Sequence, residues 1–487
     1  MRKKPNILLI IIDALRARNL SCYGYHKNTS PNINEICKDS LVFDKAYSCF
    51  NETDPSITSI LTGRYPLSHG ILRHGIISAK EIGEYYRRGN KNLAEILKLE
   101  GYRTFALSWL ERWHKEGFDY YAYYGGIGTT YLKRIAKSIL NKLPESLRKI
   151  VSQTIMKKVY NTKMLDGSTI TNHAIKIIER NLNKKPFFLL IHYIDTHLPY
   201  NSPKKYEKEF FEETSNNERI EDVLKRIKNP RWREFLKKCL SDAKTTDDVV
   251  AKYDGAIFYV DENIGRLIDY LNKHEILDDT IVIITSDHGE SLTEHNIYFS
   301  HHGLYDVTIH VPLIIKYTEL PKKRLNCFVQ HVDIVPTLLD ILNIKIDSFF
   351  FDGVSLLPLV NGKIKQIREA IFAEESAAQR KRAIRTEDLK YITKINDIKP
   401  KSGFEYEGIF NLEEDTCRYC GFKHAEPEEL YDLKNDPNEV SNIAYMQTDI
   451  VQELRSKMDN WVRNLIKINE MRMIKMKIRR IQDIKRI

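Results

Sequence analysis

The chain has 487 residues, of which 42% are hydrophobic and 29% charged, and these values are ordinary for a globular protein. No apolar stretch reaches the roughly 18 to 20 residues that a membrane-spanning helix needs, so transmembrane anchoring is not expected. The net charge of +10 is concentrated at the end of the chain, where residues 471–487 carry seven Lys or Arg against one Asp. A charge confined to one tail does not indicate a nucleic-acid-binding protein, and we expect no nucleic acid partner.

The first apolar run, residues 6–12, is interpreted as a strand. It follows Arg2, Lys3 and Lys4, as the apolar region of a secretory signal would, but it is shorter than such a region and ends at Asp13 without a cleavage site. The seven cysteines are an odd number and are scattered, which is not typical of a disulfide framework. We therefore expect a cytoplasmic protein.

Three apolar runs of the chain end at an aspartate. Residues 6–12 are followed by Asp13, residues 187–194 by Asp195, and residues 280–286 by Asp287. Unbroken runs of this kind predict strands that are buried on both faces of a parallel sheet, and residues just past such strands line the ligand crevice. Because His197 and His288 follow two of these aspartates closely, the pattern indicates a metal site.

Residues 51–64 predict a capped helix next to this crevice. Asp54 is a good N-cap, Pro55 suits the first helical position, and Gly63 can close the C-terminus. Thr53 would then lie at the helix N-terminus, where free N–H groups favour an anion. A metal-bound Thr53 hydroxyl there would be an activated nucleophile, although the same residue could merely help to cap the helix.

The pattern of strands, loops and helices predicts three parts: a catalytic domain over residues 1–361, a small α+β subdomain over residues 362–470 with a four-stranded antiparallel sheet and one helix, and a basic amphipathic tail over residues 471–487. Two insertions, residues 131–161 and 203–248, separate catalytic strands and are expected to cover the crevice.

Two further patterns outside the strand ends suggest binding roles. The tail predicts contact with a membrane surface or self-association, and a solvated terminal helix is the simpler alternative. Cys417 and Cys420, with His424, could be half of a zinc site, but no convincing second pair of ligands accompanies them.

Several segments resemble the sulfatase family of the alkaline phosphatase superfamily. They are PNILLIIIDALRARNLSCYGY from residue 5, PSITSILTGRYPLSHG from residue 55, HYIDTHLPY from residue 192, SDHGESLTEHN from residue 286, HHGLYDVTIHVPLIIK from residue 301 and ELYDLKNDPNEVSNIA from residue 429. The resemblance implies an α/β fold with a large, mostly parallel sheet, helices on both of its faces, and a small C-terminal α+β subdomain.

The chain departs from the family pattern at the nucleophile. Thr53 occupies the position of the Cys or Ser that matures to formylglycine, so no formylglycine is expected, and Ile57 occupies the position of the family arginine. Ala14 replaces the second N-terminal aspartate, and the family's lysine motif is not recognisable within residues 101–114. Relatives with a threonine nucleophile act on phosphorus, so the resemblance favours a phosphoester over a sulfate ester.

The resemblance also implies roles for the site residues. Asp13, Asp287 and His288 would bind a divalent cation with Thr53 as the fourth ligand, and imidazole in this set favours Mn²⁺, Zn²⁺ or Fe²⁺ over Ca²⁺ or Mg²⁺. The remaining candidates are expected to contact the substrate or its leaving group: His197 on the non-bridging oxygens, and His301 or His302 on the leaving group or the anion. Asp195 is expected to support His197, with a role as ligand of a second metal as the alternative.

The function implied is a metal-dependent hydrolase of sulfate or phosphate esters that works through a covalent threonine intermediate. The organic part of the ester is expected to be a small molecule, a glycan or a lipid headgroup. Two alternatives remain open: a transferase of the phosphoethanolamine or phosphoglycerol type, and a non-catalytic relative that binds anionic glycans.

Overall fold

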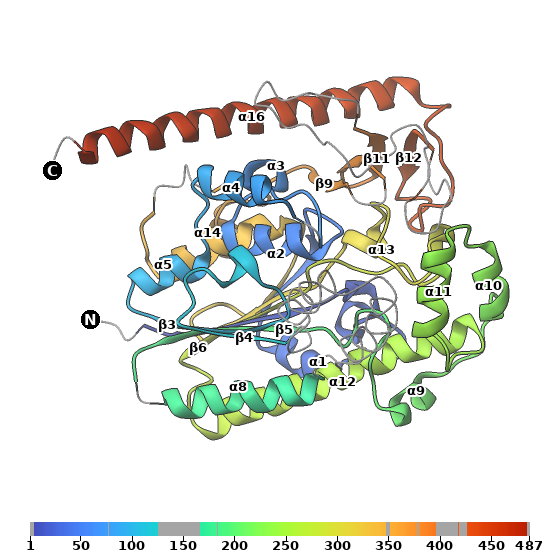
Figure 1. Ribbon diagram of the computed structural model, residues 1–487, viewed down its shortest axis with the longest axis horizontal. Coiled ribbons are helices and arrows are strands. Elements are labelled where there is room, and N and C mark those ends of the chain that lie inside the picture. The colour runs from blue at the N-terminus through green and yellow to red at the C-terminus, as the bar shows by residue number, and fades with distance from the viewer. Residues whose placement is uncertain are drawn as a thin grey trace, which may run out of the picture.

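Eight strands form a large central sheet in the order β4-β3-β5-β1-β6-β7-β2-β8 (Figure 1). The structure is a computed structural model that describes residues 4–75, 77–124, 166–182, 184–346, 351–376, 379–395, 417 and 426–484. The eight strands are β1 (Asn6–Ile12), β2 (Leu41–Tyr47), β3 (Arg103–Ser108), β4 (Tyr120–Tyr123), β5 (Phe187–Tyr193), β6 (Thr280–Thr285), β7 (Leu313–Lys316) and β8 (Lys323–Gln330). Within this sheet only β7 runs antiparallel to its neighbours.

Strand β1 shows why the apolar runs become central strands. From residue 7 to residue 12 its odd-numbered residues, such as Leu9, and its even-numbered residues, such as Ile10, are all buried, and the two sets lie in different clusters. Successive side chains of a strand point to opposite faces, so a strand covered on both faces must be apolar throughout. The predicted parallel arrangement is confirmed, because β1 pairs in parallel with both β5 and β6.

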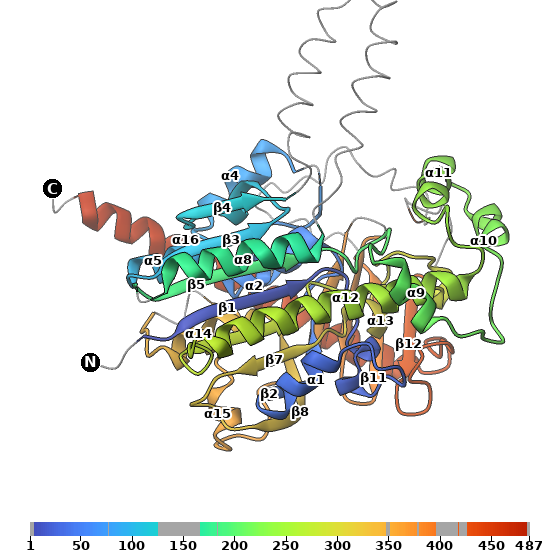
Figure 2. The ribbon, with the colours of Figure 1, turned by 90° about the horizontal axis from the view of Figure 1, so that it is seen from below.

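Helices cover both faces of this sheet, as Figures 1 and 2 show. One face carries α1 (Pro31–Lys38), α8 (Gly167–Asn181) and α12 (Thr246–Lys273). The other face carries α2 (Thr53–Thr62), α3 (Pro66–His69), α4 (Ala79–Arg87), α5 (Leu93–Leu99) and α14 (Ile334–Ile341). Shorter helices on the connections are α13 (Asp306–Ile309) and α15 (Leu357–Val360). A three-layer α/β fold is therefore confirmed.

A second, antiparallel sheet follows in the chain, in the order β12-β11-β10-β9. Its strands are β9 (Ile371–Glu375), β10 (Lys381–Arg385), β11 (Leu389–Lys394) and β12 (Glu428–Asp432), and the long helix α16 (Thr448–Ile484) packs beside them. Trp461 of α16 stacks on Phe372 at 4.5 Å between ring centroids. The predicted small α+β subdomain with four antiparallel strands is confirmed.

A buried ion-pair network joins this second sheet to the catalytic part. The ammonium group of Lys390 on β11 lies 2.6 Å from carboxylate oxygens of both Asp306, the first residue of α13, and Glu439. The side chains of Lys390 and Glu439 are buried, whereas that of Asp306 is 23% exposed and also accepts from Nε of Arg385 at 3.3 Å. Such a network is strongly destabilised when one member is removed.

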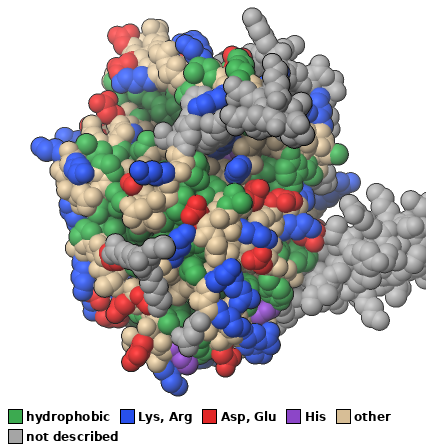
Figure 3. Space-filling model, turned by 90° about the vertical axis from the view of Figure 1, so that its left-hand side faces the viewer, with side chains coloured by type: hydrophobic (Ala, Val, Ile, Leu, Met, Phe, Trp, Pro, Cys, Tyr) green, Lys and Arg blue, Asp and Glu red, His purple; other side chains and the backbone are tan. Residues whose placement is uncertain are grey.

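Helix α16 continues without a break through residues 470 and 471, where the basic tail was predicted to begin. Met471, Ile474 and Ile478 are exposed on this part of the helix. On the face of the molecule shown in Figure 3, basic and acidic side chains are interspersed rather than gathered by sign. None of the helices in the described ranges combines the length and the apolar composition that crossing a bilayer would take. Membrane contact or self-association through the tail stays a prediction.

The second predicted insertion forms α9 (Lys204–Phe210), α10 (Ile220–Arg226) and α11 (Pro230–Cys239), all at one end of the molecule (Figure 2). Trp232 of α11 reaches back toward the crevice, with its ring 6.4 Å from that of His302. The first insertion, residues 131–161, lies outside the described residues, as do Cys420 and His424.

Candidate active site

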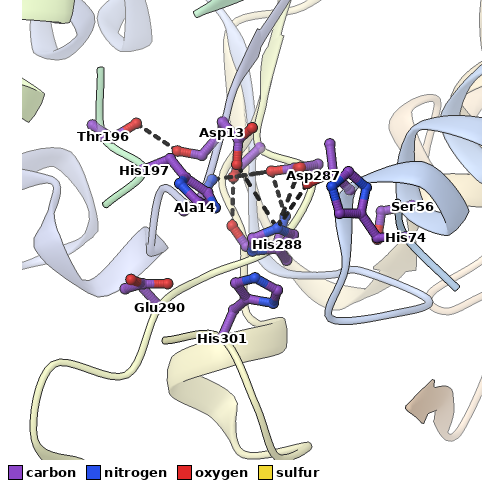
Figure 4. Close-up of polar contacts among 12 residues, drawn as sticks. Asp13, Ala14, Ser56, His74, Thr196, His197, Asp287, His288, Glu290 and His301 are labelled. Carbon is purple, nitrogen blue, oxygen red and sulfur yellow. Dashed lines mark hydrogen bonds and ion pairs between the residues drawn. The ribbon is translucent and has the colours of Figure 1, made fainter. Parts of the chain in front are cut away.

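The carboxyl ends of β5, β1 and β6 lie side by side and gather the predicted site (Figure 4). Asp13 follows β1 directly, and Asp287 lies two residues beyond β6. The backbone N–H of Ala14 donates to Asp287 Oδ1 at 3.0 Å, which ties the two strand ends together. The structure therefore brings together two aspartates that are 274 positions apart in the chain.

Asp13, Asp287 and His288 present three ligand atoms to one another in a fully buried space. Oδ1 of Asp13 and Oδ2 of Asp287 have no hydrogen-bond partner, and Nε2 of His288 lies 3.8 Å and 3.4 Å from them. The His288 Nδ1 is 2.8 Å from the Gly289 carbonyl oxygen, to which it donates, so the lone pair is on Nε2. This donor set fits a divalent cation.

The electrostatics of the two carboxylates agree with that fit. Burial, together with the neighbouring Asp13, raises the pKa of Asp287 to about 7. Burial opposes the ionisation of Asp13 as well, but the histidines His197, His192 and His288 lower its pKa below the ordinary value. Two carboxylates that share a buried site do not both ionise unless a cation compensates them, so the site suits a metal ion.

The second oxygen of Asp13 is held by two residues to which the sequence analysis gave no role. Trp109 Nε1 donates to Asp13 Oδ2 at 3.1 Å, and His192 Nε2 lies 3.3 Å from the same oxygen. The ligand atoms of Asp13, His192 and Asp287 all lie within 4.8 Å of one another, so the His192 imidazole can also reach a shared ion. The sequence could have identified His192, because a histidine is unusual inside an apolar strand such as β5. Nothing in the sequence marks Trp109, which follows β3 directly.

Thr53 is the first residue of α2 and lies beside the metal-binding group. Its Oγ1 is 3.4 Å from Nε2 of His288, and only 2% of the residue is exposed. The prediction that Asp54 caps this helix is wrong: Glu52 occupies the N-cap, and the Asp54 carboxylate instead accepts from the N–H of Gly75. Gly63 closes the helix in the left-handed conformation, as predicted.

His197 and His301 flank this group (Figure 4). The ring of His301 lies 4.3 Å from that of His288 and 6.0 Å from that of His197, between centroids. His302 lies one step farther out, with its ring 5.4 Å from that of His301. Of the two histidines that the sequence left undecided, His301 is therefore the one beside the metal-binding group.

The two flanking histidines differ in their protonation. Burial lowers the basicity of both, but Asp13 and Glu290 outweigh it at His197 and raise its pKa. At His301, burial and the neighbouring histidines His288, His302 and His197 lower the pKa well below the ordinary value. Since His301 Nδ1 donates to the carbonyl oxygen of Asn51 at 2.5 Å, its Nε2 is an acceptor.

Asp195 does not join His197, contrary to the prediction. Its Oδ1 accepts from the N–H of Gly167 at 3.0 Å, at the first residue of α8, because the free N–H groups of a helix N-terminus attract a carboxylate. Burial raises the pKa of Asp195 to about 7. The residue therefore supports the helix that packs on the sheet.

Glu290 is a buried site residue without a predicted role. Its Oε1 accepts from the hydroxyl of Tyr200 at 2.6 Å, and its Oε2 has no hydrogen-bond partner. Burial raises the pKa of Glu290 to about 7. The sequence could have identified Glu290 by its position directly after SDHG, because the same turn carries the metal-ligand candidates Asp287 and His288.

Comparison with known proteins agrees with this architecture. The family described as Sulfatase matches residues 5–344, and N-sulphoglucosamine sulphohydrolase, C-terminal, matches residues 293–419. The chain is 24% identical to the N-acetylglucosamine-6-O-sulfatase of Bacteroides thetaiotaomicron, over 91% of this chain and 83% of that protein. It is 23% identical to the multifunctional alkaline phosphatase superfamily protein PehA of Trinickia caryophylli, over 91% of each.

The crystal structure of the phosphonate monoester hydrolase of Agrobacterium radiobacter has the same fold, with a TM-score of 0.66 and 19% identity over 95% of this chain and 96% of that one. Since the Sulfatase match spans both strand-end aspartates, the helix of Thr53 and the flanking histidines, the chain belongs to the sulfatase family of the alkaline phosphatase superfamily.

Proposed function

We propose that the protein is a metal-dependent hydrolase of sulfate or phosphate esters that favours phosphoesters and uses Thr53 as its nucleophile. The observation that carries the proposal is the position of the Thr53 hydroxyl, buried at the start of α2 and 3.4 Å from a histidine of the metal-binding group. The N-acetylglucosamine-6-O-sulfatase relative and the multifunctional alkaline phosphatase superfamily protein support the ester hydrolysis itself.

Thr53 would attack the phosphorus, so that the bond between Oγ1 and phosphorus forms while the bond to the leaving oxygen breaks. His197 donates the proton that the leaving oxygen needs, because its Nδ1 is taken by the carbonyl oxygen of Leu198 at 3.0 Å and its Nε2 remains for the substrate. His301 accepts the proton of Thr53 on Nε2. In the second step the neutral His197 accepts a proton from the attacking water, and His301 returns its proton to the Thr53 oxygen as the bond from that oxygen to phosphorus breaks. Water then releases the phosphate and restores the threonine hydroxyl.

Asp13, Asp287, His288 and Thr53 would hold the cation. Bound there, a divalent cation lowers the pKa of a ligating hydroxyl and withdraws charge from the ester oxygens. Two carboxylates with imidazole favour Mn²⁺, Zn²⁺ or Fe²⁺ over Ca²⁺ or Mg²⁺. Threonine has no route to formylglycine, and a threonine sulfate has no aldehyde hydrate from which to eliminate sulfate. This chemistry supports the preference for phosphorus.

The test is hydrolysis of nitrophenyl sulfate, phosphate monoester and phosphodiester by metal-stripped protein after Mn²⁺, Zn²⁺, Mg²⁺ or Ca²⁺ is restored. Thr53→Ala should lower kcat/KM for the phosphoesters by at least about 10³-fold. Thr62→Ala is the matched control, because it removes a buried hydroxyl from the other end of the same helix, where Oγ1 bonds to the Thr58 carbonyl oxygen at 2.6 Å.

The three remaining outcomes separate the alternatives. Sulfate turnover that survives Thr53→Ala would refute the threonine nucleophile. Turnover that requires an added alcohol would indicate the transferase, and a metal-loaded protein that binds anionic glycans without turning over any ester would indicate the non-catalytic relative.

A further inference from the structure

A buried carboxylate next to the nucleophile is surrounded by cationic side chains that the proposed reaction does not use. Asp54 follows Thr53 in the first turn of α2 and is completely buried. Its Oδ2 lies 3.0 Å from Nη2 of Arg112 and 2.9 Å from Nδ1 of His74. The backbone N–H of Gly75 donates to the same oxygen at 3.0 Å. Two side chains that can carry positive charge, Arg112 and His74, therefore meet at the buried carboxylate of Asp54.

Arg112 fixes the loop of His74 onto the helix. Its Nη1 donates to the carbonyl oxygen of Gly75 at 2.8 Å while its Nη2 binds Asp54. The backbone of Arg112 has φ = +68°, a conformation that costs a residue with a side chain of order 1 to 3 kcal/mol. The surrounding contacts therefore hold Arg112 in a strained backbone conformation, with Nη1 directed to the loop and Nη2 to Asp54.

His74 is the member of this cluster that reaches both water and the metal-binding group. One third of its side chain is exposed, at 33%. Its ring lies edge-on to Trp109 at 5.4 Å between centroids, and Trp109 donates to Asp13. In Figure 4 the imidazole of His74 lies beside Asp287, on the side opposite to His197. Burial opposes protonation of His74, but Asp54 outweighs it and raises the pKa of the imidazole.

With Nδ1 engaged by Asp54, the imidazolium of His74 has one further donor, Nε2–H. The buried carboxylate of Glu52 accepts from the backbone N–H of His74 at 2.9 Å. Two carboxylates, Asp54 and Glu52, therefore face two cationic groups, Arg112 and a protonated His74. A phosphate monoester carries two negative charges at neutral pH, whereas phosphodiesters and sulfate monoesters carry one. Without the cation at His74, one carboxylate charge beside the substrate would be left uncompensated, which disfavours a dianionic ester more than a monoanionic one.

We propose that His74, fixed by Asp54 and Arg112, binds a non-bridging oxygen of the substrate and selects phosphate monoesters over phosphodiesters and sulfate esters. This inference rests on the proposed function, whose reaction supplies the substrate. His74 is then a specificity residue, and Asp54 and Arg112 are positioning residues that act through it.

The first experiment compares nitrophenyl phosphate with the matching phosphodiester in wild type and His74→Gln. Loss of one charge-assisted hydrogen bond should lower kcat/KM for the monoester by about 10- to 100-fold, mainly through KM, and for the diester by less than about 5-fold. Asp54→Asn should shift the same monoester-to-diester ratio in the same direction. Equal losses for both substrates, or no loss, would overturn the inference, because a structural role does not distinguish the two esters.

The matched control is His26→Gln. His26 also lies 3.0 Å from a carboxylate, that of Glu212, but on the surface, with 64% of its side chain exposed. The monoester-to-diester ratio of this variant should equal that of wild type, and a changed ratio would overturn the assignment to His74.

A second measurement separates this inference from the proposed function. Inorganic phosphate is titrated calorimetrically into Mn²⁺-loaded protein, which requires no turnover. His74→Gln should weaken phosphate binding about 10-fold or more even if no ester is hydrolysed. Equal phosphate affinity in wild type and His74→Gln would overturn the inference while leaving the nucleophile assignment intact.

Discussion

Trp109→Phe tests whether a hydrogen bond from Trp109 orients Asp13 as a metal ligand. The change removes the indole N–H that donates to Asp13 Oδ2 at 3.1 Å and keeps an aromatic ring against His74 and His192. A hydrogen bond to a charged group contributes about 1.5 to 3 kcal/mol. Loss of a partner that orients a ligand typically weakens metal binding about 10- to 100-fold, or about 1.4 to 2.8 kcal/mol. The two magnitudes agree, so we expect a Kd for Mn²⁺ that rises by this factor.

The assay is titration of metal-stripped protein with Mn²⁺ against a competing indicator dye. Trp113→Phe is the matched control, since it also deletes a buried indole hydrogen bond, from Nε1 to Oγ1 of Thr58 at 2.9 Å, on a residue that is not a proposed ligand. An unchanged Kd in Trp109→Phe, or an equal rise in both variants, would refute the orientation of Asp13 by Trp109.

Three further substitutions test the frame around the site. Gly289→Ala should lower both thermal stability and Mn²⁺ affinity, because the added Cβ would lie 2.1 Å from the Val307 carbonyl oxygen and the turn would have to move. We expect the free energy of unfolding, measured with denaturant, to fall by about 1 to 3 kcal/mol. Unaltered stability would contradict the close approach. Lys390→Ala should destabilise the fold by about 3 to 5 kcal/mol, since the buried carboxylate of Glu439 loses its cation while Asp306 keeps Arg385. A loss below about 1 kcal/mol would show that the network contributes little. Asp195→Asn should stabilise the protein at pH 8 by on the order of 2 kcal/mol and by much less at pH 5. The sign follows from the pKa of Asp195 in the folded protein, which burial raises to about 7. The stability that the carboxyl contributes is fully present below its unfolded pKa and is lost as the pH rises through the folded pKa. A difference in Tm between Asp195→Asn and wild type that does not change with pH would contradict this prediction.

The sequence predicted the frame of the site because that frame depends on local pattern. The runs before Asp13 and Asp287 are apolar without alternation, and only a strand covered on both faces satisfies such a run. Since the strands are parallel neighbours, their carboxyl ends had to meet, and the two aspartates with them. Gly63 was predictable for the same reason, because its left-handed conformation is a local requirement of the helix end.

The errors concern side chains whose partners lie far away in the chain. Asp54 has the composition of an N-cap, but Arg112, 58 residues later, competes for its carboxylate. Asp195 has a histidine two positions on, yet the N–H of Gly167 offers a better-aligned donor. Neither partner is visible as a periodicity or a motif, so local chemistry suggested a role that tertiary contacts overrode.

The charges of the site support one account of its selectivity. A divalent cation would balance Asp13 and Asp287. The buried carboxylates of Asp54 and Glu52 face Arg112 and His74. The side chains that remain are His197, whose pKa Asp13 and Glu290 raise against the effect of burial, and the proposed cation His74. They lie on opposite sides of the metal-binding group in Figure 4, as two donors to different oxygens of one tetrahedral anion would. Removing His74 should therefore weaken a dianionic ester more than a monoanionic one, whereas removing His197, the proton donor to the leaving oxygen, should slow the hydrolysis of both.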